Sequence, residues 1–532
     1  MKKHLMNIGL LVVIALPLFF LTPFTRELWL PDEPRYAEIA MEMADAGNWI
    51  IPRFHGELYT EKPPLYFWLL AGSAELFGNW RPFALIFPAA LSALGVIIVI
   101  YAFAAFLFDR KVGLLSALML MTSVLFLGVG QFVRMDMFLL LCFSVSLLSF
   151  YRLHVRTTSY DVVYALLFFV AAALATLTKG PIGVGLPGLI ILIFLFWTRN
   201  FSVLRKIRLF WGNLVYLAIV LAWFVPAIRQ EGWDYAYLII IKQNLGRVYG
   251  SFSHARPWYF YLHTLPWITL PWFPFLVSAM IHAWRTPTTS CEHDASRFLW
   301  IWWGTTFVFF SLVSGKLEIY LLPLLPPTAI LTAHFWLSLS TPSNTLGKLS
   351  QRLTLPAYIL AGSFLIASIV FILQGESATY WGGILLLEAI GGLLIYAAVK
   401  SSPRLLFAIV WSITPLILLY GAITVVPVLN RQLSLQPVIQ DLKRMNHGEE
   451  SLALWEFYYP IQYYIPFRVP VLRTHEEKLA FFSSPTPVYC LTRDKYLDPI
   501  RQELKRPIYV LDTYRLEHKS FLLVSQFPGE KN

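Results

Sequence analysis

Long apolar runs dominate the sequence and decide which folds are open to it. Of its 532 residues, 57% are hydrophobic and only 14% are charged, whereas soluble globular domains carry charge on about a quarter of their residues. Crossing a bilayer takes about twenty helical residues. Thirteen runs approach that length: 5–24, 83–107, 112–130, 135–151, 162–178, 181–197, 209–228, 264–283, 298–314, 318–336, 355–374, 380–399 and 405–427. The sequence therefore predicts an α-helical polytopic membrane protein with about thirteen spans.

The basic residues predict how these spans are oriented. Cytoplasmic loops of multispan proteins carry an excess of Lys and Arg. Here the excess falls before the first run and then in alternate connections, at 110–111, 152–156, 199–208, 285–297, 348–352 and 400–404. We therefore predict a cytoplasmic N-terminus, with the 25–83 loop, the 229–263 loop and the C-terminal tail on the outer face.

Charge and cysteine usage exclude other classes of protein. The net charge of +11 does not indicate nucleic acid binding, because the basic residues are scattered at the ends of apolar runs and form no tract. Cys142, Cys291 and Cys490 have neither paired nor metal-like spacing, so we expect no disulfide and no thiolate zinc site.

The composition changes near residue 428. From there to residue 532, short apolar runs alternate with polar helical stretches, a pattern that predicts a small soluble α/β domain. We therefore predict two domains: residues 1–427, a membrane domain that includes the 25–83 and 229–263 loops, and residues 428–532.

The 25–83 loop is the most polar part of the membrane domain. Asp32 or Glu33 is suited to cap a helix that has Pro34 in its first turn and ends at Gly47. This helix is amphipathic, with Glu38 on its polar side, and we expect it to lie along the membrane surface. A second helix should run from Pro63 toward Gly78.

Glu61 and Lys62 come just before the second helix. Backbone N–H groups at a helix N-terminus favour an anion, so this position is a candidate phosphate site. Solvated loop charge is the alternative, although Pro63 and Pro64 restrict the backbone there.

Ionisable groups at other outer ends of spans extend the candidate site. Such groups cost free energy unless they are paired or used, which makes them a default site hypothesis. Cations outnumber carboxylates, which suits a substrate carrying phosphate on a lipid whose tail enters a groove between spans. The candidates are Arg134, Asp136, Lys179, Arg247, His254, Arg256, Lys316 and Tyr320.

Structural interpretations compete with these functional ones. A helix cap and a functional role are equally well supported for Asp32. For Arg134 and Asp136 we favour a structural role, in which they pair with each other or with neighbouring spans. Lys179 and Lys316 serve equally well as interfacial anchors. One histidine, His254, beside a distant glutamate is weak evidence for a metal.

The first loop closely resembles that of a known enzyme family, the bacterial aminoarabinose transferases of lipid A (glycosyltransferase family 83). These are relatives of the protein O-mannosyltransferases within the GT-C fold class. The matching stretch reads LPDEPRYAEIAMEMADAGNWIIPRFHGELYTEKPPLYFWLLAGSAELFG, and later blocks that resemble the family are VRMDMFL, LTKGPIG, HARPWYFY and KLEIYLLP.

The resemblance implies transfer of 4-amino-4-deoxy-L-arabinose from undecaprenyl phosphate to a lipid A phosphate, without a nucleotide cofactor. The reaction would take place on the periplasmic face of the bacterial inner membrane and give resistance to polymyxin and cationic peptides. The alternative is transfer of another sugar, such as galactosamine, galacturonic acid or mannose, to lipid A, glycan or protein. A transporter is disfavoured, because the chain shows no repeated half and no ionisable groups near the bilayer midplane.

The resemblance also implies roles for individual residues. Asp32 matches an essential acid. Glu61 matches a metal-liganding glutamate, with His254 as the second candidate ligand for zinc or a similar divalent ion. The expected groups around the carrier phosphate and substrate are Lys62, Arg35, Tyr36, Tyr320, Lys179, Asp136 and Lys316, together with Arg247 or Arg256.

The acceptor decides what Asp32 does in this scheme. A lipid A phosphate is already anionic, so Asp32 would hold the sugar amine or stabilise positive charge on the sugar. A hydroxyl acceptor would instead require Asp32 to take a proton. We expect a single displacement that inverts the anomeric carbon.

Overall fold

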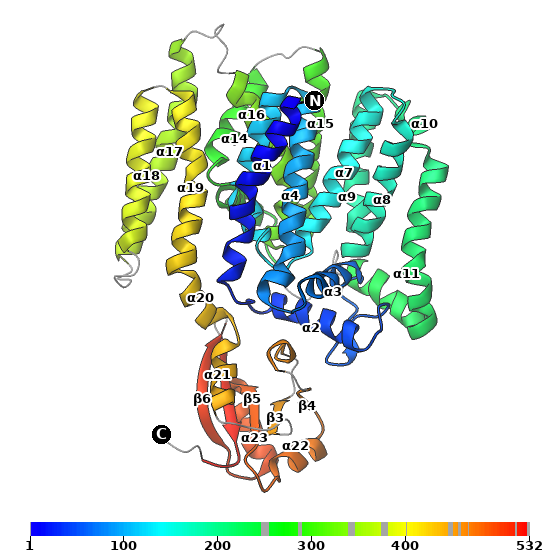
Figure 1. Ribbon diagram of the computed structural model, residues 1–532, viewed down its shortest axis with the longest axis vertical. Coiled ribbons are helices and arrows are strands. Elements are labelled where there is room, and N and C mark those ends of the chain that lie inside the picture. Colours follow the sequence, from blue (N-terminus) through cyan, green and yellow to red (C-terminus); the bar gives the residue numbers. More distant parts are fainter. Residues whose placement is uncertain are drawn as a thin grey trace. The chain divides into compact units, whose positions relative to one another are not determined.

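The computed structural model describes residues 2–245, 255–285, 290–338, 346–373, 381–400, 402–444, 451–455, 459–465, 468–516 and 519–528 (Figure 1). The chain divides into two compact units. Unit 1 comprises residues 1–23, 60–69 and 86–422, and unit 2 comprises residues 24–59, 70–85 and 423–532. Residues 24–59 therefore belong to the same unit as the C-terminal tail. The division of the sequence into domains 1–427 and 428–532 stays a prediction.

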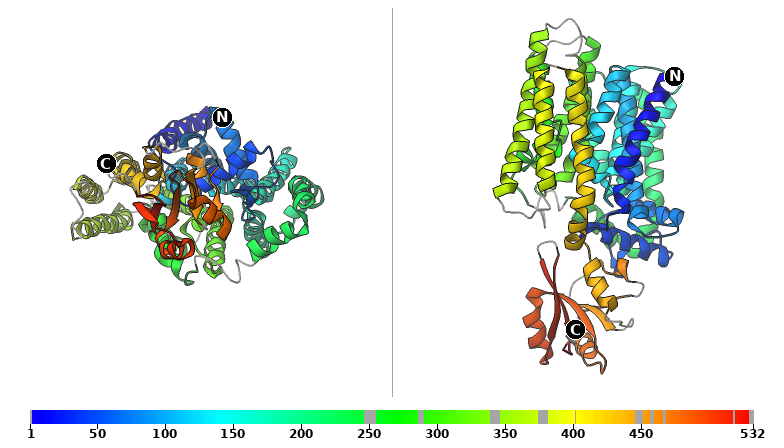
Figure 2. Two further views of the ribbon diagram at one scale, coloured as in Figure 1. Left: turned by 90° about the horizontal axis from the view of Figure 1, so that it is seen from below. Right: turned by 60° about the vertical axis from the view of Figure 1, so that its left-hand side comes forward.

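Unit 1 is helical, and its long helices run side by side in Figures 1 and 2. Apolar side chains from almost all of these helices form one continuous core. The helices, of which α4 and α19 extend into unit 2, are α1 (Lys2–Phe20), α4 (Pro82–Leu107), α5 (Arg110–Met121), α6 (Val124–Val129), α7 (Asp136–Val155), α8 (Asp161–Lys179), α9 (Ile182–Thr198), α10 (Val203–Ile207), α11 (Leu209–Tyr237), η2 (Leu238–Leu245), α13 (Phe260–Ile268), α14 (Phe273–Arg285), α15 (Ser290–Leu312), η3 (Glu318–Leu324), α16 (Leu325–Ser338), α17 (Leu346–Leu373), α18 (Trp381–Val399) and α19 (Pro403–Thr424).

Nine helices among the described residues are long and apolar enough to cross a membrane, and a tenth span is present if the bent pair α13 and α14 counts as one. The chain is a multi-pass membrane protein, with fewer such helices than the thirteen predicted runs. The run at 181–197 forms a shorter apolar helix, α9, and most of the run at 298–314 lies in α15, which ends at Leu312.

The predicted run at 112–130 is not one continuous helix. Between α5 and α6 its backbone leaves the helical conformation and makes hydrogen bonds with other segments. Ser123 is extended, and the N–H of Val124 donates to the carbonyl of Leu270 over 3.0 Å. The carbonyl of Thr122 accepts from the hydroxyl of Thr414 over 2.7 Å. These partners lie far along the chain, so hydropathy alone does not reveal the break.

The C-terminal part of unit 2 is the predicted small α/β domain. Its sheet has the order β4-β3-β5-β7-β6, in which β3 is parallel to β4 and β5, and β7 is antiparallel to both of its neighbours. The strands are β3 (Leu452–Trp455), β4 (Val471–Leu472), β5 (Tyr489–Arg493), β6 (Tyr509–Leu516) and β7 (Lys519–Ser525), and the helices are α20 (Val426–Leu433), α21 (Gln436–Arg444), η6 (Gln462–Tyr464), α22 (His475–Phe482), η7 (Asp494–Tyr496) and α23 (Leu497–Leu504) (Figure 2).

Alternation along the sheet gives unit 2 two apolar cores. Leu452 and Leu454 of β3 belong to one cluster, and Ala453 and Trp455 belong to the other. Successive side chains of a strand point to opposite faces of the sheet. Both faces are therefore covered.

The first loop supplies the rest of unit 2. It contains α2 (Asp32–Asp45), the hairpin β1 (Arg53–Phe54) and β2 (Glu57–Leu58), and much of α3 (Leu65–Phe77). Gly47 and Gly78 follow the two helices with φ of +61° and +63°, the left-handed conformation that favours glycine after a helix C-terminus. Both predicted helix ends are confirmed.

Two predictions about α2 are wrong. The helix begins at Asp32 after Pro31, and no side chain caps it, so neither Asp32 nor Glu33 is the cap. Glu38 is fully buried rather than on a polar face. The reason is that α2 packs against η6 and β1 within unit 2.

Candidate functional site

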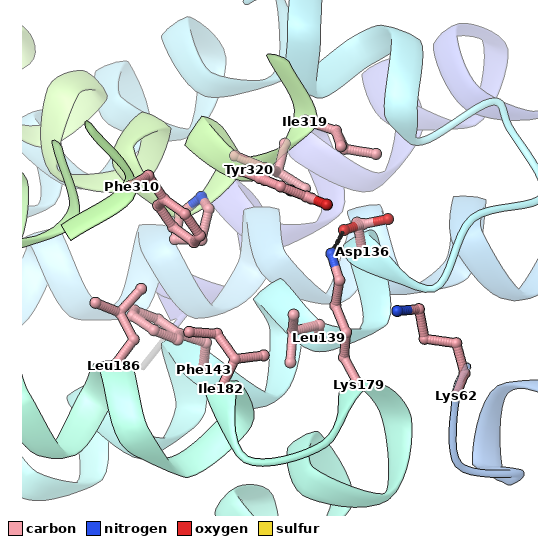
Figure 3. A pocket seen from close by; sticks show the side chains of 12 residues that line it. Lys62, Asp136, Leu139, Phe143, Lys179, Ile182, Leu186, Phe310, Ile319 and Tyr320 are labelled. Carbon is pink, nitrogen blue, oxygen red and sulfur yellow. Dashed lines mark hydrogen bonds and ion pairs between the residues drawn. The ribbon is translucent and has the colours of Figure 1, made fainter. Parts of the chain in front are cut away.

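A pocket in unit 1 combines charged and apolar side chains (Figure 3). Its volume is about 150 Å³. It lies where α7 begins, α8 ends and η3 passes. The lining residues are Lys62, Asp136, Leu139, Phe143, Lys179, Ile182, Leu186, Phe310, Ile319, Tyr320, Leu322 and Pro323.

The antiparallel hairpin of α7 and α8 sets the charged end of this pocket. Asp136 is the first residue of α7 and Lys179 is the last of α8. Gly180 terminates α8 with a φ of +80°. A carboxylate at a helix N-terminus and an ammonium at a helix C-terminus are both favoured by the helix dipoles. The two groups therefore meet with favourable local electrostatics.

Asp136 and Lys179 form an ion pair (Figure 3). Asp136 is 7% exposed, so the pair is largely shielded from water, and its attraction is stronger than at the surface. Asp136 therefore pairs with a neighbouring span, the second of the two structural partners that the sequence left open. Lys179 is also more than an interfacial anchor, because its ammonium points into a pocket.

Tyr320 covers the same ion pair from η3. The ammonium of Lys179 lies 4.9 Å from the centroid of the Tyr320 ring, within the range of a cation–π contact. The ring also stacks on Phe310 at a centroid distance of 5.6 Å. The carbonyl of Leu317, just before η3, accepts a 3.0 Å hydrogen bond from the hydroxyl of Tyr261. Tyr320 is thus held with its hydroxyl toward the charged end (Figure 3).

Lys62 completes the charged end from the segment that precedes α3. Its ammonium points toward Asp136 and Lys179 in Figure 3. Among the residues that line the pocket, two carry an ammonium group and one carries a carboxylate, so the lining is positive on balance. Such an arrangement suits a phosphate, which would receive charge-assisted hydrogen bonds.

The opposite side of the pocket is apolar. A groove for a lipid tail was expected from the sequence, but none of its lining residues was identified there. Leu139 and Phe143 are one turn apart on α7, as are Ile182 and Leu186 on α9. Residues four apart lie on one helix face. An apolar residue follows each charged candidate by three positions, and a second follows four positions later. This repeated spacing after Asp136 and Lys179 is the sequence signal that could have revealed the lining.

Several predicted site residues do not line the pocket. Lys316 is 3% exposed, and its ammonium donates to the carbonyl of Val313. Arg256 is exposed, its backbone N–H donates to Ser314 over 3.2 Å, and its guanidinium lies 5.8 Å from the centroid of Phe260. Glu61 is partly buried outside the lining. Arg247 and His254 lie outside the described residues.

Asp32, Arg35 and Tyr36 form a cluster within unit 2. Arg35 pairs with Asp32 over 2.5 Å. Its guanidinium also lies 5.6 Å from the ring centroid of Tyr36 and 6.0 Å from that of Tyr59. The Asp32 carboxylate is therefore held by the Arg35 guanidinium, which lies one turn further along the same helix.

The predicted metal site is not tested by the geometry. Within the described ranges, no group of three or more His, Cys, Asp or Glu side chains could hold a metal ion. Because His254 falls outside those ranges, a metal held by Glu61 and His254 stays a prediction.

Comparison with known proteins finds similarity to proteins that are named for sugar transfer from a lipid phosphate. Residues 61–228 match the family described as dolichyl-phosphate-mannose-protein mannosyltransferase. A protein of Erwinia tasmaniensis named undecaprenyl phosphate-alpha-4-amino-4-deoxy-L-arabinose arabinosyl transferase is 33% identical over 338 residues, which cover 61% of this chain and 59% of that protein. A protein of the same name from Shewanella sediminis is 31% identical over 341 residues, covering 63% and 60%. The matched part spans about three fifths of these relatives, and the predicted resemblance is confirmed.

A solved structure shares the fold across nearly the whole chain. The crystal structure of ArnT from Cupriavidus metallidurans bound to undecaprenyl phosphate matches with a TM-score of 0.77 and 21% identity, covering 98% of both chains. The same protein in the apo state gives 0.76. The predicted fold class, the GT-C fold with a small C-terminal α/β domain, is confirmed.

Proposed function

We propose that this protein is a glycosyltransferase that moves 4-amino-4-deoxy-L-arabinose from undecaprenyl phosphate to a lipid A phosphate. The observation that carries the proposal is the pocket in which Lys62, Lys179 and Tyr320 face one another beside an apolar lining. The names of the curated relatives support the choice of sugar and carrier. The product would carry less negative charge and so give resistance to polymyxin and other cationic peptides.

The charged end of the pocket suits the carrier phosphate. When the sugar–phosphate bond breaks, negative charge grows on the phosphate that leaves. Fixed ammonium groups in a site shielded from water stabilise such charge without reorganising. We assign this role to Lys62 and Lys179, with Asp136 holding Lys179 in place.

The apolar side of the pocket suits the start of the prenyl chain. Leu139, Phe143, Ile182 and Leu186 offer hydrocarbon surface within reach of the ammonium groups. Burying apolar surface contributes about 25 cal/mol per Å². A phosphate with a long apolar tail therefore satisfies both sides, whereas a free nucleotide sugar satisfies only one.

In the proposed reaction, an oxygen of the acceptor phosphate attacks the anomeric carbon of the sugar. A new carbon–oxygen bond forms as the bond to the carrier phosphate breaks, and undecaprenyl phosphate leaves with the electron pair. The acceptor is already anionic, so no proton has to be removed. One displacement inverts the anomeric carbon.

The remaining assignments are proposals from the resemblance. Asp32 would hold the sugar amine or stabilise positive charge on the sugar. The other groups proposed to act on substrate are Arg35, Tyr36 and Arg247 or Arg256, and Glu61 and His254 are the proposed metal ligands.

We also propose that the pocket faces the periplasm from the bacterial inner membrane. The alternation of basic connections supports this orientation. Arg152 is in the last turn of α7, at the end opposite Asp136, so the pocket and a basic connection lie at opposite ends of one span.

Transfer of a different sugar is the second candidate function. The family that matches residues 61–228 is named for mannose transfer to proteins. The pocket residues described above suit a phosphate and a lipid tail, and these are common to lipid-phosphate sugars whatever the sugar. Transfer of a hexose by the same phosphate site is therefore the main alternative.

Mass spectrometry of lipid A tests the proposal. Lipid A is compared from cells that contain the protein, cells that lack it, and cells that carry Lys62→Ala at the same membrane level. We expect aminoarabinose-sized additions only with the unaltered protein. Lipid A that is the same in all three would overturn the proposal, and additions of another size would support the second candidate.

A further inference from the structure

Two arginines converge on one aromatic ring at the end of α7 that lies away from the pocket. The guanidinium carbon of Arg152 lies 3.7 Å from the ring centroid of Phe106, and that of Arg156 lies 5.6 Å from it. Arg152 also lies 5.8 Å from the ring of Tyr164 on α8. Three helices, α4, α7 and α8, therefore contribute to one basic cluster, defined here as Arg152, Arg156, Phe106 and Tyr164.

This cluster has no counter-ion from the described part of the protein. Neither guanidinium forms an ion pair or a side-chain hydrogen bond with any described residue, and Nε of Arg152 is buried without a partner. Two like charges one helical turn apart disfavour each other. An external anion would remove that cost.

Carboxylates at neighbouring helix ends have other partners. Asp109 accepts hydrogen bonds from the backbone of Lys111 and Val112, over 2.7 and 2.9 Å. Asp161 accepts from the backbone and hydroxyl of Thr158, over 2.9 and 3.2 Å. These acids stabilise helix starts and turns, so they do not neutralise the cluster.

The geometry of Arg152 selects the kind of anion. Stacking on Phe106 covers one face of the planar guanidinium and leaves its edge, which carries the N–H donors. That edge matches two oxygens of a phosphate or carboxylate in a bidentate arrangement. A second guanidinium on the same ring adds donors from Arg156, which favours the more highly charged and more numerous oxygens of a phosphate.

The depth of the cluster matches a phospholipid headgroup. Asp136 and Arg152 are separated by about 24 Å along α7 at 1.5 Å per residue, close to the roughly 30 Å hydrocarbon thickness of a bilayer. Beside Tyr164, Val163 and Leu167 of α8 are 50% and 42% exposed, which provides apolar surface for an acyl chain. We propose that Arg152 and Arg156 bind the phosphate of an anionic phospholipid in the leaflet opposite the pocket.

Native mass spectrometry of the full-length protein in detergent tests this site. Dioleoyl phosphatidylglycerol is titrated into the unaltered protein and into the double variant Arg152→Gln/Arg156→Gln, with dioleoyl phosphatidylcholine as the neutral-headgroup comparison. Sodium phosphate is added in a separate arm. Arg297→Gln is the matched control, because this half-exposed arginine has a protein partner in Asp294, at 3.5 Å.

We expect the double variant to bind phosphatidylglycerol about tenfold more weakly, because at least one charge-assisted contact is lost. The control should bind like the unaltered protein. Equal lipid binding by the double variant would overturn the proposal and leave the arginines as interfacial anchors. Displacement of the lipid by millimolar sodium phosphate would reassign the site to free phosphate. If the double variant unfolds, the single variant Arg156→Gln decides, since Arg156 is exposed and the Arg152–Phe106 stack is kept.

Discussion

The guanidinium of Arg26 donates to both carboxylate oxygens of Glu33, over 2.6 and 2.7 Å. The side chains are only 4% and 3% exposed. The same carboxylate accepts a 2.7 Å hydrogen bond from the backbone of Trp29. This buried pair folds residues 26–29 back onto the start of α2, next to Asp32.

Breaking this pair should destabilise the protein strongly. Arg26→Gln leaves the Glu33 carboxylate buried without its ion-pair partner, and breaking a buried pair in this way typically costs about 3–5 kcal/mol. The double variant Arg26→Met/Glu33→Leu should lose less than either single change, because no buried charge remains. Thermal unfolding in detergent measures the stability of the variants relative to one another. Arg297→Gln, which breaks a half-exposed pair with Asp294, is the control and should cost less than about 1 kcal/mol. A double variant less stable than both single variants would contradict the argument.

Asp32→Asn should abolish transfer without unfolding α2. The cap position of α2 is Pro31, without a side-chain cap, so an amide of the same shape at Asp32 should leave the helix start intact and remove the charge that pairs with Arg35. The measurement is growth with polymyxin at matched membrane levels. Asp45→Asn, at the other end of α2 and exposed, is the control and should behave normally. Normal resistance with Asp32→Asn would refute the role of this acid.

Lys62→Ala should lower transfer by about 10²–10³-fold, the effect of removing one fixed group that stabilises transition-state charge. Lys62→Arg keeps the cation and should retain part of the activity. Transfer from a lipid-phosphate sugar by purified protein measures both variants. Lys111→Ala, an exposed lysine next to the cap of α5, should be unaffected. Full activity of Lys62→Ala would remove Lys62 from the carrier-phosphate site.

Glu38 should make unit 2 less stable as pH rises. Burial, together with the nearby charge of Glu42, raises the pKa of Glu38 to about 9, so its neutral form is the one that the fold accommodates. Burial lowers the pKa of His55, whose Nε2 lies 3.0 Å from the Glu38 carboxyl. The unfolded chain releases the Glu38 proton near its ordinary pKa of 4.5. The stabilisation is therefore complete below that pH and is lost as pH rises through about 9.

Melting temperatures between pH 5 and pH 9 test this dependence. Glu38→Gln should reduce the fall in stability, which for one proton is at most about 1.4 kcal/mol per pH unit. Glu57→Gln, whose side chain is 60% exposed in a surface pair with Arg473, should follow the unaltered protein. Identical pH profiles for Glu38→Gln and the unaltered protein would show that Glu38 does not carry the effect.

Asn430→Ala should loosen the segment before α2. The amide oxygen of Asn430 accepts from the backbone of Glu27 and the indole of Trp29, over 3.1 and 2.9 Å, and its amide nitrogen donates to the carbonyl of Thr25 over 3.2 Å. Each lost hydrogen bond costs about 0.5–1.5 kcal/mol. Hydrogen exchange should therefore accelerate in residues 25–33. Asn200→Ala, whose exposed side chain accepts from Ser202, is the control. Unchanged exchange in Asn430→Ala would contradict the assignment.

Much of the site was within reach of the sequence. Lys62, Asp136, Lys179 and Tyr320 were all candidates, and all four line one pocket. Each lies at or near the end of a helix, where an ionisable or phenolic side chain needs a partner. Lys316 was indistinguishable from them by sequence, since it has the same residue type and the same position after a span. Only the fold shows that its ammonium is used by a backbone carbonyl.

The sequence by itself determined that the chain is a helical membrane protein with a small α/β tail. Hydropathy, turn glycines and alternation are properties of residues that are close in the sequence. Their structural effect therefore does not depend on contacts with distant parts of the chain. Only the tertiary structure decided that Asp136 pairs with Lys179, 43 residues away, rather than with Arg134 two residues away. It also decided that Glu38 is buried and that 112–130 is broken at Thr122, because both depend on packing partners distant along the chain.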